Sequence, residues 1–482
     1  MRYLSSGKRK LTHFYRFRFG VFGDPEEHLS FQDFLHWFVL HSSDEGFHLY
    51  LSKDVVGYLF KRRRFNRFSR IEQAIFLYRS KSDSLFRLSI SRKIFSQWLR
   101  DHGKSEYPLL TQIQRESRSV SFGASKGGYS DVLLVCPSNL ETGIGRLVKT
   151  VSNQCQNLDL IVELKIFEFL NHASNLREEF QRSAANSKLV IYCLSLVELN
   201  YLYYSLGPEL MESVSSKSIF YGPWELEKIP KSLLSGLCGV NEIWAISQFA
   251  NQAFSTHHSN VIDIGIAIGE SADEAKGVGS PFFQFLTVCA VGSYLERKNP
   301  EGVLNAFLTA FPKESSTGPF RLRIHISDVS NLDLLPEFSD LDKRVSVTFG
   351  SLDRSGYEEM FESSQCYVSL HRAEGFGHAI AEAINFGLPV IVTKYGGITD
   401  FCTEENCHFI EYKEIEISSG DYPYSYGLKW ADPDLDCAVE AMKKVGSSGL
   451  NRLELNSLRN YTDNVEYKVR LKLAERICSV DR

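Results

Sequence analysis

The sequence predicts an α/β protein in which two doubly wound parallel-sheet domains follow one another, preceded by a mainly helical N-terminal extension. Short apolar runs of strand length recur from residue 131 onward, as expected for strands that are buried on both faces. Helix-length segments separate these runs, and the alternation begins again near residue 280. The chain has 482 residues, which is enough for roughly two to four domains of ordinary size.

The N-terminal extension, residues 1–130, is aromatic and basic. It holds 23 Lys and Arg against 12 Asp and Glu, although the whole chain has a net charge of −5. Apolar spacing at 31–40 and 94–99 predicts helices with one buried face, and the Ser- and Gly-rich stretch 115–130 predicts a linker. The positive charge fits contact with phospholipid, a lipid-linked glycan or nucleic acid, of which nucleic acid is the weakest alternative. A solvated face of a helical domain explains the same charge equally well.

Composition and motif searches favour a globular protein and give no sign of a secreted, membrane-spanning or zinc-binding one. Hydrophobic residues make up 43% and charged residues 23%, which is ordinary for a globular chain. The N-terminus lacks the apolar core of a secretory signal, and no apolar stretch is long enough to span a bilayer. The ten cysteines form no CxxC or Cys/His zinc pattern. We therefore expect no metal site and a cytoplasmic protein, with contact at the inner face of the membrane left open.

The first α/β domain is predicted at 131–275 and the second at 276–450. Expected strands of the first domain lie at 132–138, 160–164, 188–196, 242–247 and 261–268, with a helix at 142–154. Expected strands of the second lie at 285–292, 320–327, 345–350, 366–371 and 389–393, with helices at 298–311, 355–364 and 376–386. The charged segment 451–482 has a helical period and is predicted to pack back across the domain interface.

The segment 369–393 predicts an anion site. A strand ends near its start, a loop with Gly375 and Gly377 follows, and a helix then begins near His378. The two glycines let the backbone turn tightly and approach a ligand closely. Free N–H groups and the dipole at a helix N-terminus favour a bound anion. Ligands of such sheets bind at the carboxyl ends of the strands, where this loop lies.

Two carboxylates flank that anion site. Glu374 precedes the helix, and Glu382 lies two turns into it. A carboxylate beside a phosphate is unfavourable unless it accepts hydrogen bonds from hydroxyl groups, which sugar and ribose supply. Each residue alone would be explained as an ordinary helix-start acid or a solvated helix residue. Their joint occurrence in this frame favours a sugar-nucleotide site.

The motif EGFGHAIAEAINFGLPVIVT resembles the E-x7-E signature of retaining glycosyltransferase family 4. That family has the GT-B fold, in which two Rossmann-like domains face a cleft. The resemblance implies that Glu374 contacts donor-sugar hydroxyls and that Glu382 holds the nucleotide ribose. It also implies that the backbone after the first Glu binds the diphosphate, which here means Gly375, Phe376, Gly377 and His378.

Two further segments resemble the same family. The stretch VGSYLERKNPEG implies that Arg297 and Lys298 neutralise the leaving diphosphate, with a charged turn beside a helix as the alternative. TGIGRLVK resembles the glycine loop that faces the cleft. There Gly143 and Gly145 would permit close approach of a substrate, and Arg146 would hold an anion. A GxG pair alone is a weak signal, so this assignment depends on its position after the first strand.

Additional stretches resemble a subgroup that builds bacterial surface polysaccharides, among them FYGPWELEKIP at 220–230 and KWADPDLDC at 429–437. Within the first of these, Trp224 and Glu225 are candidates for the acceptor side, with core packing as the alternative for Trp224. The resemblance covers about 131–450. Ala290 and the run 396–398 depart from the family pattern and leave the donor sugar open.

The resemblance implies hexosyl transfer with retention, from a nucleotide-diphosphate sugar to a glycan or lipid-linked oligosaccharide. The donor is a substrate, so no cofactor is expected, and no DxD-type metal motif lies in the place expected for one. The leaving phosphate would assist the acceptor hydroxyl, so no protein base is named. Two alternatives remain, a non-catalytic sugar-nucleotide-binding scaffold subunit of a glycan assembly complex and a GT-B-fold epimerase. The sequence leaves open the base, sugar, acceptor, linkage and oligomeric state.

Overall fold

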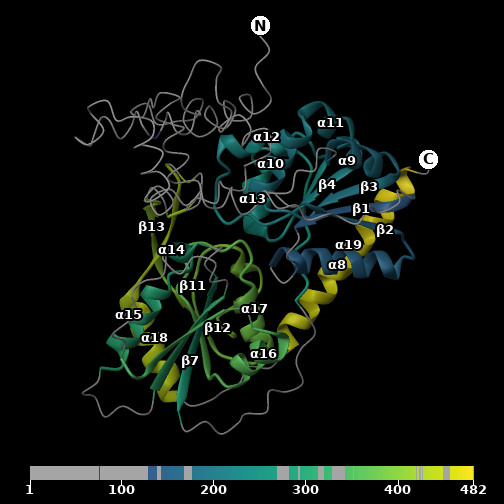
Figure 1. The fold of residues 1–482 in the computed structure, drawn as a ribbon. Coiled ribbons are helices and arrows are strands. Elements are labelled where there is room, and N and C mark those ends of the chain that lie inside the picture. Colours follow the sequence, from purple (N-terminus) through teal and green to yellow (C-terminus); the bar gives the residue numbers. More distant parts are fainter. Residues whose placement is uncertain are drawn as a thin grey trace, which may run out of the picture.

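The computed structural model of the chain is shown in Figure 1. It describes residues 75, 129–137, 140, 143–167, 176–268, 282–290, 294–312, 320–327, 342–350, 352–418, 421–422, 425, 427–448 and 456–480. The predicted N-terminal helical extension therefore lies outside the described residues, apart from Ile75 and the last two positions of that range.

The first domain contains a six-stranded parallel sheet of order β2-β1-β3-β4-β5-β6. Helices cover both faces of this sheet (Figure 1), which explains why β1 and β3 are apolar almost throughout. The strands are β1 (Ser130–Pro137), β2 (Val162–Phe167), β3 (Ser187–Tyr192), β4 (Ser218–Tyr221), β5 (Glu242–Ala245) and β6 (Val261–Asp263). The helices are α8 (Gly143–Asn157), α9 (Leu176–Ala185), α10 (Leu196–Leu206), α11 (Pro208–Ser213), η4 (Ser215–Lys217), η5 (Lys231–Leu233), α12 (Leu234–Leu237) and α13 (Gln248–Ser255).

The second domain repeats this design with a parallel sheet of order β12-β11-β10-β7-β8-β9. Its strands are β7 (Phe283–Ala290), β8 (Phe320–Ser327), β9 (Val345–Phe349), β10 (Cys366–Ser369), β11 (Val390–Thr393) and β12 (Cys407–Ile410). Its helices are α14 (Leu295–Lys298), α15 (Pro300–Ala310), α16 (Arg354–Glu362), α17 (His378–Asn385), η8 (Gly397–Asp400) and α18 (Leu435–Ser448). An antiparallel pair, β13 (Tyr412–Glu416) and β14 (Lys429–Pro433), follows β12.

The predicted fold class is confirmed, and the structure corrects several elements. β4, β12 and the β13–β14 pair were missed, because polar residues interrupt β12, β13 and β14 and because β4 has only three consecutive apolar residues. The strand expected at 261–268 ends at Asp263, since Gly265 takes a φ of +88°. The helix expected at 298–311 is broken at Asn299, whose left-handed backbone ends α14 while its side chain caps the Gly302 N–H of α15.

The last helix, α19 (Asn456–Val480), runs from the second domain to the first. Near its start Tyr461 packs against Phe376 and Phe401 of the second domain. Further along, the helix packs on α8 and β3 of the first domain (Figure 1). Its side chains Val469 and Leu473 are fully buried there. The helix therefore ties the two domains together.

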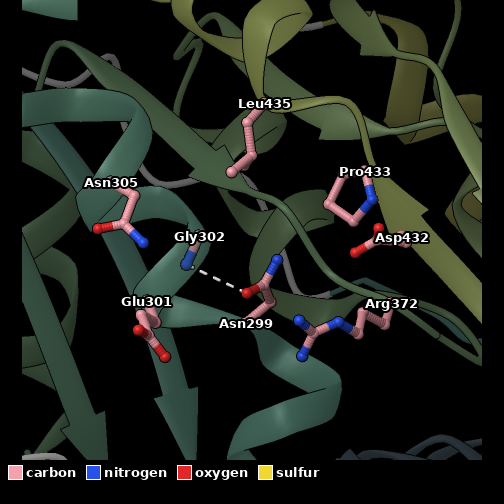
Figure 2. A pocket seen from close by; sticks show the side chains of 8 residues that line it. All are labelled: Asn299, Glu301, Gly302, Asn305, Arg372, Asp432, Pro433 and Leu435. Carbon is pink, nitrogen blue, oxygen red and sulfur yellow. Dashed lines mark hydrogen bonds between the residues drawn. The ribbon is translucent and has the colours of Figure 1, made fainter. Parts of the chain in front are cut away.

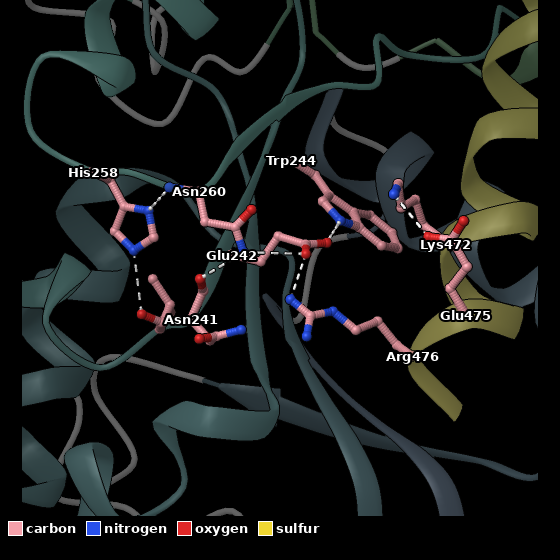
Figure 3. A network of polar contacts seen from close by, with 9 residues as sticks. Asn241, Glu242, Trp244, His258, Asn260, Lys472, Glu475 and Arg476 are labelled. Atoms are coloured by element: carbon pink, nitrogen blue, oxygen red, sulfur yellow. Dashed lines mark hydrogen bonds and ion pairs between the residues drawn. The ribbon is translucent and has the colours of Figure 1, made fainter. Parts of the chain in front are cut away.

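A polar network fixes the far end of α19 (Figure 3). Arg476 forms an ion pair with Glu242 of β5, a carboxylate that is only 4% exposed. The Trp244 indole N–H donates to the same carboxylate at 2.5 Å, and Asn260 donates to it at 3.3 Å. A buried carboxylate with several donors is compensated for its lost hydration, so this contact holds the helix on the first domain.

Four cysteines that lie in apolar runs of the sequence are buried free thiols, namely Cys136, Cys193, Cys289 and Cys366. Burial raises the pKa of Cys136 and of Cys289 to about 11, so both remain protonated at neutral pH. None of the helices in the described ranges combines the length and the apolar character needed to cross a bilayer.

Candidate functional site

Sheet topology brings together two segments that are 76 positions apart in the chain. Strands β7 and β10 are neighbours in the second sheet, so α14 and the loop that ends at Gly377 leave the sheet side by side. The Arg372 N–H donates to the Arg297 carbonyl at 2.8 Å, and the Asn299 amide donates to the Leu370 carbonyl at 2.9 Å. These contacts fix α14 against the loop at the carboxyl edge of the sheet.

The three charged residues predicted to act together meet at this edge. Glu374 is 6% exposed and forms ion pairs with Lys298 and Arg297, the second with Arg297 Nη1 3.3 Å from Glu374 Oε2. Arg297 also donates to the Ala373 carbonyl at 2.6 Å. Burial alone would raise the pKa of Glu374, but Lys298 and then Arg297 outweigh it and hold that pKa well below its usual range. The carboxylate is therefore ionised at neutral pH.

Helix α17 begins directly beside this cluster. Its N-cap, Gly377, has a φ of +91° and no side-chain cap, and a Cβ there would lie 2.6 Å from Ile398 Cγ2. Only glycine fits both the backbone and the space. No hydrogen bond joins the N–H groups of Phe376, Gly377 or His378 to another described residue. Three main-chain donors at a helix N-terminus can therefore bind an anion.

The second predicted carboxylate, Glu382, is held from both domains. Tyr357 of α16 donates to Glu382 Oε2 at 2.7 Å, and Arg146 of α8 in the first domain forms an ion pair with Oε1. Arg146 was expected to hold a ligand anion, and in the structure its partner is this protein carboxylate. A ribose that used both oxygens of Glu382 would have to displace these contacts.

The two glycines of the first-domain loop have different surroundings. A Cβ on Gly143 would lie 2.8 Å from the His378 ring, so this glycine lets the two domains approach each other at α17. A Cβ on Gly145 would lie 1.8 Å from the Leu140 carbonyl oxygen within its own domain. The space beside Gly145 is thus filled by backbone, which gives a packing reason for glycine there rather than the expected close approach of a substrate.

The domains also meet at Gly375. A Cβ on Gly375 would lie 2.6 Å from the Trp224 carbonyl oxygen, and Ser247 Oγ donates to the Gly375 carbonyl at 2.7 Å. Behind it, a Cβ on Gly397 would lie 1.9 Å from the same carbonyl oxygen. The loop that carries Glu374 is therefore packed closely on two sides, which fixes its backbone.

Two buried histidines lie near the cluster. His371 hydrogen-bonds through Nε2 to the Tyr395 carbonyl at 2.9 Å and through Nδ1 to Ser369 Oγ at 3.1 Å. Burial lowers the pKa of His371 to about 4. Burial, with Arg146 nearby, lowers the pKa of His378 to about 3, and its Nδ1 has no hydrogen-bond partner among the described residues. Both rings are neutral at pH 7.

A separate polar cavity opens behind α14, between α15 and the end of β14 (Figure 2). Arg372 reaches its wall from the Glu374 loop, where it pairs with Glu296 at 2.9 Å. None of the predicted site residues lines this cavity. The residues that do are Asn299, Glu301, Gly302, Asn305, Arg372, Asp432, Pro433 and Leu435.

Sequence reasoning missed several residues that shape the site, above all Tyr357, Ser247 and Tyr422. Each contacts a residue that lies far away in the chain, so the spacing within one segment does not reveal the contact. In the described residues, no group of three or more His, Cys, Asp and Glu side chains could hold a metal ion.

Comparison with known proteins identifies similar families and structures. Residues 284–417 match the family model "Glycosyl transferases group 1". The structure is similar to Anabaena HepE (Alr3699) in complex with UDP and glucose, with a TM-score of 0.51, 12% identity and coverage of 73% of this chain and 100% of that one. It also matches the lipopolysaccharide outer core galactosyltransferase WaaB, with a TM-score of 0.48, 13% identity and coverage of 73% and 99%. No curated protein sequence gives a significant match. The two parallel-sheet domains have the GT-B fold.

Proposed function

We propose that the protein is a retaining glycosyltransferase that moves a sugar from a nucleotide-diphosphate sugar to a hydroxyl of a glycan or lipid-linked glycan. The observation that carries the proposal is the convergence of Arg297 and Lys298 on Glu374 beside the N-terminus of α17. This cluster lies inside the segment that matches the glycosyltransferase family model, 284–417. The GT-B fold is consistent with the same chemistry but does not by itself determine it.

In the proposed donor site, the cations and the carboxylates bind different parts of the nucleotide sugar. Arg297, Lys298 and the free N–H groups at the start of α17 suit a diphosphate. Glu374 suits the hydroxyls of the donor sugar, and Glu382, oriented by Tyr357, suits those of the ribose. HepE was crystallised with UDP and glucose, which makes UDP-glucose the first donor to test.

Charge develops on the distal phosphate as the bond to the anomeric carbon breaks. Two cations and a helix N-terminus, held in place before the reaction, stabilise that charge most effectively in a site that excludes water. We propose that this arrangement acts without a metal ion and that the leaving phosphate accepts the acceptor proton. Hexosyl transfer in surface polysaccharide synthesis, at the inner face of the membrane, is the setting that the sequence resemblance favours.

The test measures binding and turnover separately. Thermal shift with UDP, GDP and UDP-glucose reports binding, since a specific ligand stabilises the folded protein by mass action. Release of UDP from UDP-glucose reports turnover, in the wild type and in Glu374→Gln and Lys298→Met, with Lys443→Met at an exposed ion pair as a control. We expect turnover to fall at least about 100-fold in both site variants. Unchanged turnover in Glu374→Gln, or a wild type that binds none of these nucleotides, would refute the proposal.

A further inference from the structure

The loop after β4 approaches the charged cluster from the first domain. β4 is a central strand of the first sheet, and its carboxyl end leads to Trp224 and Glu225. The Trp224 carbonyl oxygen lies where a side chain on Gly375 would be, so the backbones of the two domains touch one residue away from Glu374. Glu225 therefore directly follows the residue at which the first domain touches the Glu374 loop.

The Glu225 carboxylate is held by the second domain. Tyr422 donates its hydroxyl proton to Glu225 Oε2 at 2.6 Å, and the Tyr422 ring packs at 5.1 Å on the ring of Tyr294, the residue before α14. Burial lowers the pKa of Arg297, but Glu374 and then Glu225 outweigh it and raise that pKa. Arg297 is thus stabilised in its charged form by a carboxylate of each domain.

Part of this group is left without a partner. Among the described residues, none donates a hydrogen bond to the other oxygen, Glu225 Oε1. The adjacent Trp224 is 3% exposed, and its indole N–H has no acceptor in the described part of the chain. Glu225 is partly exposed, so this second oxygen can accept a hydrogen bond from a ligand hydroxyl.

The chemistry of this carboxylate selects the kind of ligand. A carboxylate accepts hydrogen bonds and repels anions, so Glu225 disfavours a phosphate beside it. A hydroxyl group can donate a hydrogen bond to Glu225 Oε1. Neutral polyols, and sugars in particular, present such hydroxyls in adjacent pairs.

We propose that Glu225 is a specificity residue that binds a hydroxyl of the acceptor, and that the acceptor presents a sugar or polyol at this position. This inference rests on the proposed function, since it assigns the acceptor side of the same reaction. The donor nucleotide then lies with Arg297 and the α17 N-terminus, and the acceptor hydroxyl lies with Glu225.

The test titrates the UDP-saturated protein with n-octyl β-D-glucoside, n-octyl β-D-galactoside and glycerol, and follows binding by calorimetry. We expect the wild type to bind at least one of them, and Glu225→Gln and Glu225→Ala to bind it at least tenfold more weakly while UDP binding is retained. Glu225→Asp keeps the charge and should recover part of the affinity. Glu227→Gln, at an exposed position in the same loop, is the matched control and should bind as the wild type does.

Two outcomes overturn the inference, provided that UDP binds. One is a wild type that binds none of the three polyols, and the other is equal binding by the wild type and Glu225→Ala. Failure of the wild type to bind UDP would instead refute the proposed function, so the two failures are distinguishable. Melting temperatures of the variants, which we expect to match the wild type because Glu225 is only partly buried, separate lost binding from lost folding.

Discussion

The ion pair between Arg297 and Glu374 should couple strongly to the stability of the second domain. Both side chains are almost fully buried, and Arg297 Nη1 lies 3.3 Å from Glu374 Oε2. At this separation and an effective dielectric constant of about 20, the Coulomb energy is about 5 kcal/mol. Lys298 also pairs with Glu374 and compensates part of the loss, so we expect a coupling energy of about 2–4 kcal/mol.

A double-mutant cycle measures this coupling. The variants are Arg297→Met, Glu374→Gln and their combination, and urea unfolding gives the free energy of unfolding of each. The matched control is the exposed pair Lys443 and Glu440, for which we expect less than about 0.5 kcal/mol. A coupling of Arg297 to Glu374 below that same value would show that the two charges are solvated and would refute the reasoning from burial.

Three further predictions concern stability. His371 is neutral in the folded protein because burial lowers its pKa to about 4, so the free energy of unfolding falls as the pH falls from about 6.5 toward 4. The variant His371→Gln should reduce the loss of unfolding free energy between pH 7 and 5 by about 2 kcal/mol. An unchanged pH profile of stability would contradict this. Gly397→Ala should lower the free energy of unfolding in urea by about 2–3 kcal/mol, because its Cβ would lie 1.9 Å from a carbonyl oxygen. Gly356→Ala, whose Cβ would have its nearest neighbour at 3.1 Å, should lower it by less than about 1 kcal/mol. Equal losses in the two variants would argue against a rigid loop. Arg476→Met should speed amide hydrogen exchange in the last turns of α19, because buried Glu242 loses its ion pair. Lys472→Met removes an exposed ion pair and should leave the exchange unchanged. Protection that persists in Arg476→Met would show that the contact with Glu242 does not hold the end of the helix.

The fold could be predicted because parallel strands that are buried on both faces consist mostly of apolar residues, which form recognisable runs in the sequence. β4, with only three consecutive apolar residues, and β12, which His408 interrupts, carry too little of that signal to stand out. The position of Asn299 illustrates a second limit, since a single left-handed residue divides a stretch whose periodicity reads as one helix.

The candidate site could be predicted where its residues lie in short segments that carry a recognisable pattern. Glu374, Gly377 and Glu382 lie within one strand–loop–helix segment, so their spacing carries the information. Their partners do not share that property, because Ser247 lies 128 positions from its acceptor Gly375 and Tyr422 lies 197 positions from Glu225. Such contacts depend on how the two domains meet, and no local pattern encodes that arrangement.

The path of α19 has a consequence for the order in which the molecule assembles during synthesis. This helix packs on α8 and β3 of the first domain, yet it is translated after the whole second domain. Until it emerges, the surface that receives Val469 and Leu473 stays open to water, and Glu242 lacks its cation. The first α/β domain is therefore completed only after the second has been synthesised, and its apolar surface at α8 stays uncovered until then.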